Sequence, residues 1–168
     1  MGNHEYIVLG VSFSWGTRKG LDIFKKLALD LPSEYRILMV GIDEKTEKDM
    51  PANINVIPRT SSKEELAEIY TAADVFVNPT REDTFPSVNI ESLACGTPVV
   101  TFATGGSPEI IDNSCGMVVP IDDYDSLKDA IEKICAGRLF SSDACVKRAN
   151  LFDKPKKYRS YLELYESV

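Results

Sequence analysis

Residues 73–102 read ADVFVNPTREDTFPSVNIESLACGTPVVTF, and this stretch decides the fold of the 168-residue chain. It begins and ends with two short apolar runs, Ala73–Val77 and Pro98–Phe102, which have the length and composition of buried β-strands. Between them, residues 87–94 are predicted to form a helix, with Gly96 just beyond its end. A strand, a helix and a strand in succession, with strands apolar throughout, indicate a βαβ unit of a parallel sheet.

The same alternation of strands and helices continues on both sides of this stretch. Further strands are predicted at Tyr6–Val11, Tyr35–Gly41, Asn53–Ile57 and Gly116–Val119, and helices at Lys19–Leu31, Ser61–Ala72, Asp125–Ala136 and Pro155–Val168. We therefore predict one α/β domain, a doubly wound, Rossmann-like parallel sheet of about six strands with helices on both faces. Ligands of such sheets bind beyond the carboxyl ends of the strands, which selects the loops after Val11, Val40, Ile57, Val77 and Phe102.

Composition and charge exclude several classes of function. The net charge of −7 argues against a nucleic-acid partner, which requires a basic face. Four cysteines without a C-x-x-C pair, together with a single histidine, argue against a zinc site, so no metal site is predicted. Cys95 and Cys115 are expected to be buried free thiols, which fits a reducing, cytoplasmic location. No apolar run approaches 18 residues, and no signal peptide is recognised.

The first loop with binding chemistry follows the first strand and reads GVSFSWGTRKG over residues 10–20. Because a helix is predicted to begin at its end, its free amides and Lys19 favour a phosphate group. The loop matches neither G-x-G-x-x-G nor the phosphate-binding pattern G-x-x-x-x-G-K-[ST]. A solvated pair of Arg18 and Lys19 at a helix start is the structural alternative.

The second loop leads into the helix at 87–94 and places carboxylates on both sides of the helix start. Asp83 lies just before the helix, and Glu91 lies about one turn inside it. The free amides of the first turn can bind an anion, and the carboxylates on both sides can accept hydrogen bonds from hydroxyl groups. A nucleotide sugar has this arrangement, since its diphosphate lies between two hydroxyl-bearing rings. In the structural alternative, Asp83 caps the helix and Glu91 is a solvated helix residue.

The third loop contains Gly105 and Gly106, which permit a close approach of the backbone to a ligand. Ser107 is predicted to cap the helix that follows, with Pro108 at its first position. A common turn without a ligand is the alternative. All three loops belong to the same edge of the predicted sheet, so together they favour a binding site more strongly than each does alone.

Four segments together resemble the C-terminal half of retaining glycosyltransferases of family 4, also called group 1. They are ADVFVNP at 73–79, the pair Asp83 and Glu91 separated by seven residues, GTPVV at 96–100 and TGGSPE at 104–109. The resemblance implies the GT-B fold, in which two Rossmann-like domains enclose the active site. Residues 1–168 would then form the donor-binding domain, and the N-terminal acceptor domain would be absent.

The resemblance also implies roles for individual residues. Lys19 matches the family's phosphate-binding lysine, and Asp83 stands where the family has the glutamate that faces the donor sugar. The adjacent Glu82 is an alternative to Asp83. Glu91 would bind the ribose hydroxyls, and the amides of Ser87 and Val88 would bind the diphosphate.

Two departures from the family pattern concern the phosphate site. Val11 stands where the family often has an arginine, and Pro86 replaces a glycine of the motif. A second cation for the diphosphate would then come from Arg18, Arg81 or Arg59, or be missing. Contacts to the base are expected near Arg59 and Thr60, largely from the backbone.

We therefore expect a hexosyltransferase that uses a UDP- or GDP-linked sugar, without a metal or other cofactor, in the synthesis of surface polysaccharide or another glycan. The acceptor, a glycan or a lipid-linked sugar, would bind the absent domain, and the full-length enzyme would be cytoplasmic with peripheral membrane association. The isolated chain should bind its donor weakly and turn over little.

Two other classes remain open. One comprises other GT-B proteins, namely sucrose-synthase-like or glycogen-synthase-like enzymes and epimerases. The second is a non-enzymatic, flavodoxin-like binding domain. A phosphoacceptor receiver domain is disfavoured because Val11-Ser12 and Pro58-Arg59 occupy the places of its acidic residues.

Overall fold

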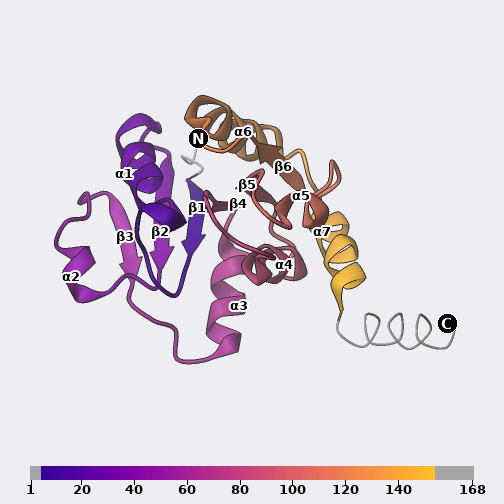
Figure 1. Cartoon of the computed structure of the whole chain (residues 1–168), viewed down its shortest axis with the longest axis horizontal. Helices are drawn as coiled ribbons and strands as arrows, with labels where there is room; N and C mark the ends of the chain where they lie inside the picture. The colour runs from indigo at the N-terminus through magenta and orange to yellow at the C-terminus, as the bar shows by residue number, and fades with distance from the viewer. Residues whose placement is uncertain (1–4, 154–168) are drawn as a thin grey trace, which may run out of the picture.

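The computed structural model of the chain describes residues 5–153, which form a six-stranded parallel sheet covered by helices (Figure 1). The strands are β1 (Tyr6–Val11), β2 (Tyr35–Val40), β3 (Ile54–Ile57), β4 (Val75–Asn78), β5 (Val99–Phe102) and β6 (Gly116–Val119). Their order in the sheet is β3-β2-β1-β4-β5-β6, with every pair parallel. This order is that of the Rossmann fold and not that of flavodoxin. The predicted doubly wound fold is confirmed, and the flavodoxin-like alternative is wrong.

Seven α-helices and two short 3₁₀ helices occur in the described part of the chain. The α-helices are α1 (Leu21–Asp30), α2 (Glu44–Glu47), α3 (Lys63–Ala72), α4 (Ser87–Ala94), α5 (Ser107–Ile110), α6 (Tyr124–Gly137) and α7 (Ser142–Ala149); the 3₁₀ helices are η1 (Thr17–Lys19) and η2 (Asn150–Phe152). The predicted helix at Pro155–Val168 lies outside the described residues.

The core consists of two apolar layers, one on each face of the sheet. Helices α1 and α6 pack on one face through residues such as Phe24 and Ile131. Helices α3, α4, α5 and α7 cover the other face, where Tyr70 and Leu93 are buried. Because successive strand residues point to opposite faces, Val8 joins the first layer while Leu9 joins the second. Strands buried on both faces explain the continuous apolar runs in the sequence.

The connections after the central strands β1 and β4 run to opposite faces of the sheet. The chain leaves β1 for α1 on one face and leaves β4 for α4 on the other face. Loops that leave neighbouring strands in opposite directions open a crevice at the carboxyl ends of those strands, which is where open α/β sheets bind ligands. The first two loops singled out in the sequence lie at this crevice.

Three local predictions are corrected by the structure. The first helix begins at Leu21 and not at Lys19, because Gly20 has a left-handed conformation (φ 77°) that separates η1 from α1. The cap of α3 is Ser62 and not Ser61: the Ser62 side chain accepts from the amide of Glu65, while the Glu65 carboxylate accepts from the amide of Ser61. Ser107 does not cap α5; it is the first residue of that helix.

The described cysteines are all free thiols. Cys115 is buried as predicted, whereas Cys95 is only half-buried. Burial raises the pKa of both thiols. Among residues 5–153, no helix combines the length and the apolar character that crossing a membrane demands.

Candidate functional site

Two adjoining cavities open at the carboxyl edge of the sheet, in the crevice between the loops after β1 and β4. The larger has a volume of about 960 Å³ and the smaller about 290 Å³. Both are lined by the β1 loop and by the start of α4, through a shared set of residues: Val11, Ser12, Phe13, Ser87 and Val88. A ligand with two dissimilar ends could therefore occupy both cavities and cross the start of α4 between them.

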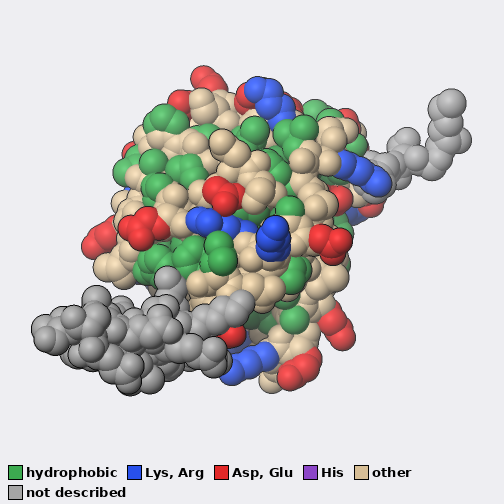
Figure 2. Space-filling view, turned by 90° about the vertical axis from the view of Figure 1, so that its right-hand side faces the viewer, with side chains coloured by type: hydrophobic (Ala, Val, Ile, Leu, Met, Phe, Trp, Pro, Cys, Tyr) green, Lys and Arg blue, Asp and Glu red, His purple; other side chains and the backbone are tan. Residues whose placement is uncertain are grey.

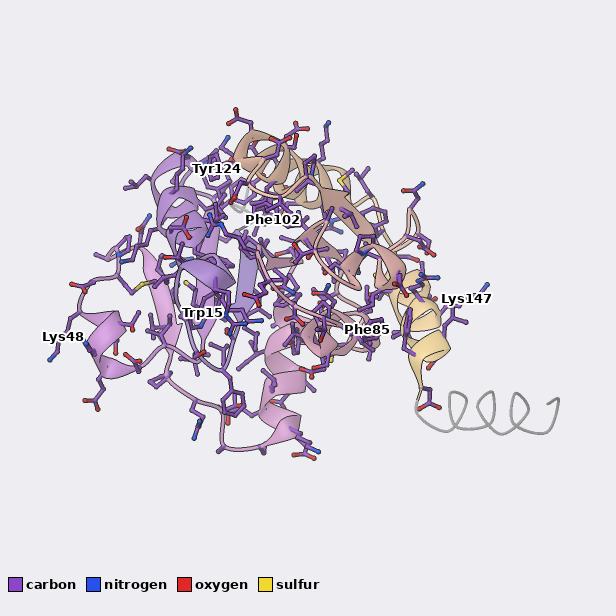
Figure 3. All side chains as sticks on the ribbon, in the orientation of Figure 1. Trp15, Lys48, Phe85, Phe102, Tyr124 and Lys147 are labelled. Atoms are coloured by element: carbon purple, nitrogen blue, oxygen red, sulfur yellow. The ribbon has the colours of Figure 1, made fainter. Side chains whose placement is uncertain are left out.

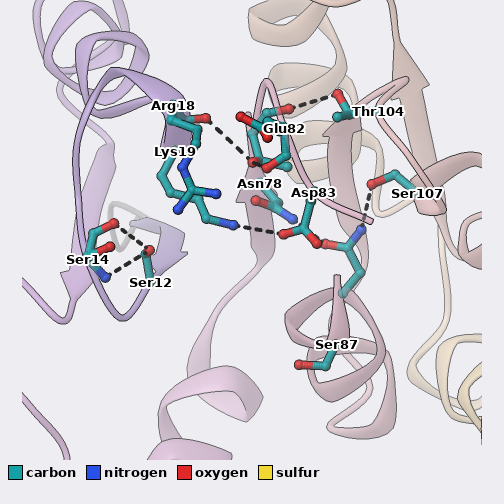
Figure 4. A network of polar contacts seen from close by, with 12 residues as sticks. Ser12, Ser14, Arg18, Lys19, Asn78, Glu82, Asp83, Ser87, Thr104 and Ser107 are labelled. Carbon is teal, nitrogen blue, oxygen red and sulfur yellow. Dashed lines mark hydrogen bonds and ion pairs between the residues drawn. The ribbon is translucent and has the colours of Figure 1, made fainter. Parts of the chain in front are cut away.

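The smaller cavity contains an ion pair between two predicted site residues. Lys19 Nζ donates to Asp83 Oδ2 at 2.7 Å, with the two side chains 21% and 19% exposed (Figure 4). Lys19 comes from η1, at the end of the β1 loop, and Asp83 comes from the β4 loop, 64 residues further along the chain. The sheet order thus brings together the cation and the carboxylate that the sequence singled out separately.

The start of α4 lies between the two cavities and has no side-chain cap. Pro86 occupies the N-cap position, and no side chain accepts from the first turn there. The amides of Ser87 and Val88 have no acceptor within the helix, because the residues four positions earlier precede it. The alternative in which Asp83 caps this helix is therefore wrong, since Asp83 pairs with Lys19 instead.

Glu91 lines the larger cavity and is held by two hydroxyl groups. Ser87 Oγ donates to Glu91 Oε1 at 3.2 Å, and Tyr70 Oη donates to Glu91 Oε2 at 3.4 Å. Tyr70 is buried, and its burial, with a smaller effect of the Glu91 charge, raises its pKa above the usual range, so it remains a donor. Glu91 is exposed, as expected of a solvated helix residue, but the two hydrogen bonds from Ser87 and Tyr70 fix the orientation of its carboxylate.

The larger cavity is also lined by Arg59 and Thr60, the residues expected near the base. The Arg59 guanidinium lies over the ring of Phe13, with its carbon 5.1 Å from the ring centroid. Phe13 is 91% exposed and lines both cavities. An exposed aromatic ring and a cation in the lining of an apolar cavity offer a stacking surface for a planar ring.

The three arginines considered as a second cation lie in different places. Arg18 lines the smaller cavity and is exposed, and Figure 4 shows it beside Lys19. Arg59 lines only the larger cavity. Arg81 lines neither, because its side chain is bound to carboxylates of Asp22 and Asp122. The geometry favours Arg18 as the second cation beside Lys19.

Glu82, the alternative to Asp83, is exposed and lines neither cavity, so the geometry favours Asp83. Gly105 and Gly106 also line neither cavity, and their expected close approach to a ligand stays a prediction. They approach the β4 loop instead: a Cβ added to Gly105 would lie 1.8 Å from the carbonyl oxygen of Asp83, and one on Gly106 would lie 2.3 Å from the ring of Phe85. Their place is behind the loop that carries Asp83.

Several residues of the site were missed by the reading of the sequence. Trp15 lines the smaller cavity and donates from Nε1 to the Val40 carbonyl at 2.9 Å, which holds the β1 loop over the end of β2. Asn78 lines the same cavity and donates to Asn89 Oδ1 at 2.8 Å. Figure 3 shows Trp15 and Phe85 on the side of the sheet toward which β1 runs. An asparagine that ends an apolar strand was the one signal that the sequence offered.

The arrangement suits an anion flanked by hydroxyl-bearing groups. The smaller cavity offers Lys19, Arg18 and a carboxylate, the start of α4 offers amides, and the larger cavity offers Glu91 and an aromatic surface. Among residues 5–153, no group of three or more histidine, cysteine, aspartate or glutamate side chains could hold a metal ion. On the face shown in Figure 2, basic side chains lie among acidic and apolar ones.

Comparisons with known proteins show which sequences and structures the chain is similar to. The D-inositol 3-phosphate glycosyltransferase of Mycobacteroides abscessus is 34% identical over 129 residues, which cover 69% of this chain and 29% of that protein. The sulfoquinovosyl transferase SQD2 of Arabidopsis thaliana is 36% identical over 102 residues, which cover 57% of this chain and 19% of that protein. The chain thus spans less than a third of these relatives.

Solved structures show the same fold. The sucrose-phosphate synthase of Thermosynechococcus elongatus matches with a TM-score of 0.80 and 26% identity, covering the whole of this chain and 47% of that one. HepE of Anabaena, solved in complex with UDP, matches with a TM-score of 0.80 at 17% identity, over 98% of this chain and 50% of that one. The model of the family described as glycosyl transferases group 1 matches residues 3–151. Because this match covers most of the chain, we conclude that the chain belongs to the group 1 glycosyltransferases.

Proposed function

We propose that this chain is the donor-binding part of a retaining glycosyltransferase that transfers a sugar from a nucleoside-diphosphate sugar. One observation carries the proposal: Lys19 and Asp83 meet in a cavity that adjoins, across the open start of α4, a second cavity containing Glu91. The order of groups along this crevice matches the order of groups in the donor. The sugar and diphosphate would occupy the smaller cavity, and the ribose and base the larger one.

Each residue then has a distinct task. When the bond between the sugar and the diphosphate breaks, negative charge builds on the departing diphosphate, and Lys19 with the amides of Ser87 and Val88 stabilises it. Asp83 accepts hydrogen bonds from the sugar hydroxyls, and Glu91 accepts them from the ribose. These groups belong to ordered elements, so little reorganisation is needed when the donor binds.

We further propose that the diphosphate is neutralised by these groups without a metal ion. Lys19 and the exposed Arg18 line the cavity where the diphosphate would lie, and the start of α4 adds its positive dipole end. Donor affinity should therefore be the same in EDTA and in millimolar magnesium. A loss of affinity in EDTA would contradict this part of the proposal.

The acceptor and the rest of the enzyme lie beyond this chain in the proposal. The favoured acceptor is a glycan or a lipid-linked sugar in surface polysaccharide or glycan synthesis, bound by a second domain, with the whole enzyme cytoplasmic and peripheral to the membrane. The chain alone would then bind the donor weakly and transfer little.

A second candidate is transfer to a small phosphorylated polyol or sugar. Its support is the similarity to proteins named D-inositol 3-phosphate glycosyltransferase and sucrose-phosphate synthase. A product assay on the longer protein, with soluble and lipid-linked acceptors in parallel, separates the two candidates.

Calorimetric titration of the chain with UDP, GDP, ADP and their sugar derivatives tests the donor site. We expect Lys19→Met to weaken binding of the preferred diphosphate roughly 10- to 100-fold, since a hydrogen bond to a charged group contributes about 1.5–3 kcal/mol. Glu91→Gln should weaken nucleoside and diphosphate alike. The matched control is Lys133→Met, which removes a lysine paired with Asp129 on α6, away from both cavities.

Two outcomes of this titration would contradict the proposed donor site. If no nucleoside diphosphate binds, or if Lys19→Met and Lys133→Met have the same effect, the donor site is not where the geometry puts it.

A further inference from the structure

Arg81 joins three segments that meet beside the proposed donor site. Its Nη1 and Nη2 atoms donate to Asp22 Oδ1 and Oδ2, both at 2.8 Å, and Nε donates to Asp122 Oδ1 at 2.6 Å. Nη1 also donates to the carbonyl of Thr17 in η1. One guanidinium thus connects the β4 loop with η1, with the first turn of α1 and with the loop after β6.

The backbone of the β4 loop is attached to η1 at the same place. The amide of Arg81 donates to the carbonyl of Arg18 at 2.9 Å, and Thr80 Oγ1 donates to the carbonyl of Glu82 at 3.0 Å. Thr104 Oγ1 donates to the carbonyl of Thr80 at 2.8 Å from the other side (Figure 4). The segments that carry Lys19 and Asp83 are therefore bound to each other, by a backbone hydrogen bond and by the side chain of Arg81.

The contacts of Arg81 leave it unsuited to bind a phosphate group. Its partners are two carboxylates, and the hydrogen bonds that it donates to Asp22, and then those to Asp122, raise the pKa of Arg81 above the usual range. The pKa of Asp22 is correspondingly lowered by its hydrogen bond with Arg81. Asp122 has a left-handed backbone (φ 63°), which is costly for a residue other than glycine. The left-handed residue in the loop after β6 is thus the same residue that binds Arg81.

We propose that Arg81 is a positioning residue, which holds the turn carrying Lys19 against the loop carrying Asp83 so that both face the smaller cavity. The proposal rests on the proposed function, since it assigns the held pair to the donor diphosphate and sugar. It differs from the expectation that Arg81 supplies a second cation, because Arg81 acts here through Lys19. Its effect on phosphate binding must therefore disappear when Lys19 is absent.

A double-mutant cycle tests this dependence in the 168-residue chain. Arg81→Met, Lys19→Met and the double variant are compared in calorimetric titrations with the preferred nucleoside diphosphate and with the matching nucleoside. Arg36→Met is the matched control, because Arg36 donates from Nε and Nη2 to Glu5 at the opposite edge of the sheet. Hydrogen exchange of residues 17–20 and 80–85, measured without ligand, reports directly on whether η1 and the β4 loop are held together.

We expect Arg81→Met to weaken diphosphate binding about tenfold, to leave nucleoside binding within about twofold, and to add less than about twofold to the effect of Lys19→Met. Exchange in the two segments should accelerate in Arg81→Met and stay unchanged in Arg36→Met. If Arg81→Met fails to fold, Arg81→Lys carries the test, because it keeps the charge but cannot reach both carboxylates and Thr17 together.

Additive losses from Lys19→Met and Arg81→Met would overturn the proposal, since they would mean that Arg81 acts on the ligand independently. Unchanged exchange in both segments, or a parallel loss of nucleoside binding, would overturn it as well. A wild-type chain that binds no nucleoside diphosphate would refute the proposed function instead. The exchange measurement would still decide whether Arg81 holds the two segments together.

Discussion

Replacing Asp83 with asparagine should strengthen binding of a nucleoside diphosphate and weaken binding of the corresponding nucleotide sugar. Without ligand, Lys19 is paired with Asp83 at 2.7 Å, and both side chains are about four-fifths buried (21% and 19% exposed). A diphosphate that reaches Lys19 must compete with this carboxylate and also bear its negative charge. Asp83→Asn removes both obstacles, whereas the sugar loses a charged hydrogen-bond acceptor.

The magnitude follows from Coulomb's law. Two unit charges about 6 Å apart, at an effective dielectric constant of about 40 to 50, interact with slightly more than about 1 kcal/mol. Relief of this repulsion should improve diphosphate affinity by roughly fivefold. A charged hydrogen bond exceeds a neutral one by about 1 kcal/mol, so the sugar should lose a similar amount. The ratio of the two affinities should therefore shift by roughly 10- to 30-fold in favour of the free diphosphate.

Isothermal titration calorimetry with the diphosphate and with its sugar derivative measures this ratio directly. Asp129→Asn is the control, because it removes the carboxylate of another lysine pair, with Lys133 on the distant helix α6. The diphosphate gain should also shrink in high salt, since it is electrostatic. Equal weakening of both ligands by Asp83→Asn would refute the reasoning, because Asp83 would then support the fold of the site rather than compete for Lys19.

Three further outcomes are expected. In chemical denaturation, Gly105→Ala should lower the free energy of unfolding by at least about 1 kcal/mol, because Gly105 is left-handed (φ 49°) and an added Cβ would meet the carbonyl of Asp83. Gly16→Ala should be neutral, because an added Cβ there would have no atom within 4 Å. Tyr70→Phe should weaken nucleoside binding about two- to threefold in calorimetry, by freeing Glu91, and equal affinities would show that Tyr70 does not orient it. Burial raises the pKa of Cys135 and Cys145 to about 12, above the unfolded value of about 8.5. The contribution of these thiols to stability should therefore be fully present below about pH 8.5 and be lost between about pH 8.5 and pH 12. A urea midpoint that stays constant over this range would contradict the assignment.

The sequence predicts the sheet well because its strands are buried on both faces. A run such as Tyr6–Val11 can hardly form any other element once helices with apolar faces follow it. Local boundaries are less predictable where neighbouring residues offer the same chemistry. Either Ser61 or Ser62 could cap α3; in the structure Ser62 does so, while Ser61 donates from its amide and hydroxyl to Glu65 Oε2. Gly20 likewise interrupts what the spacing of apolar residues presents as one continuous helix.

The contacts within the site are less predictable, because they join distant parts of the chain. The partners of Arg81 are 59 and 41 residues away, and no local pattern distinguishes an arginine that binds carboxylates from one that binds phosphate. The neighbours of Gly105 and Gly106 could not be predicted from the sequence for the same reason. Their freedom of conformation was recognised, but which neighbour they approach depends on how α5 lies against the β4 loop.

The β4 loop explains why weak local signals combine into one site. It is fixed to η1 through Arg81, to the start of α5 by the hydrogen bond from the Gly106 amide to the Thr84 carbonyl, and to the buried end of β4 beneath it. A loop held on several sides has little entropy to lose when a ligand binds, so its carboxylate and the amides of α4 can act at fixed positions. Lys19 is held in the same way but is already paired with Asp83. The ligand therefore exchanges partners within a preformed site rather than building one, and affinity for the diphosphate should depend on that exchange more than on the number of cations nearby.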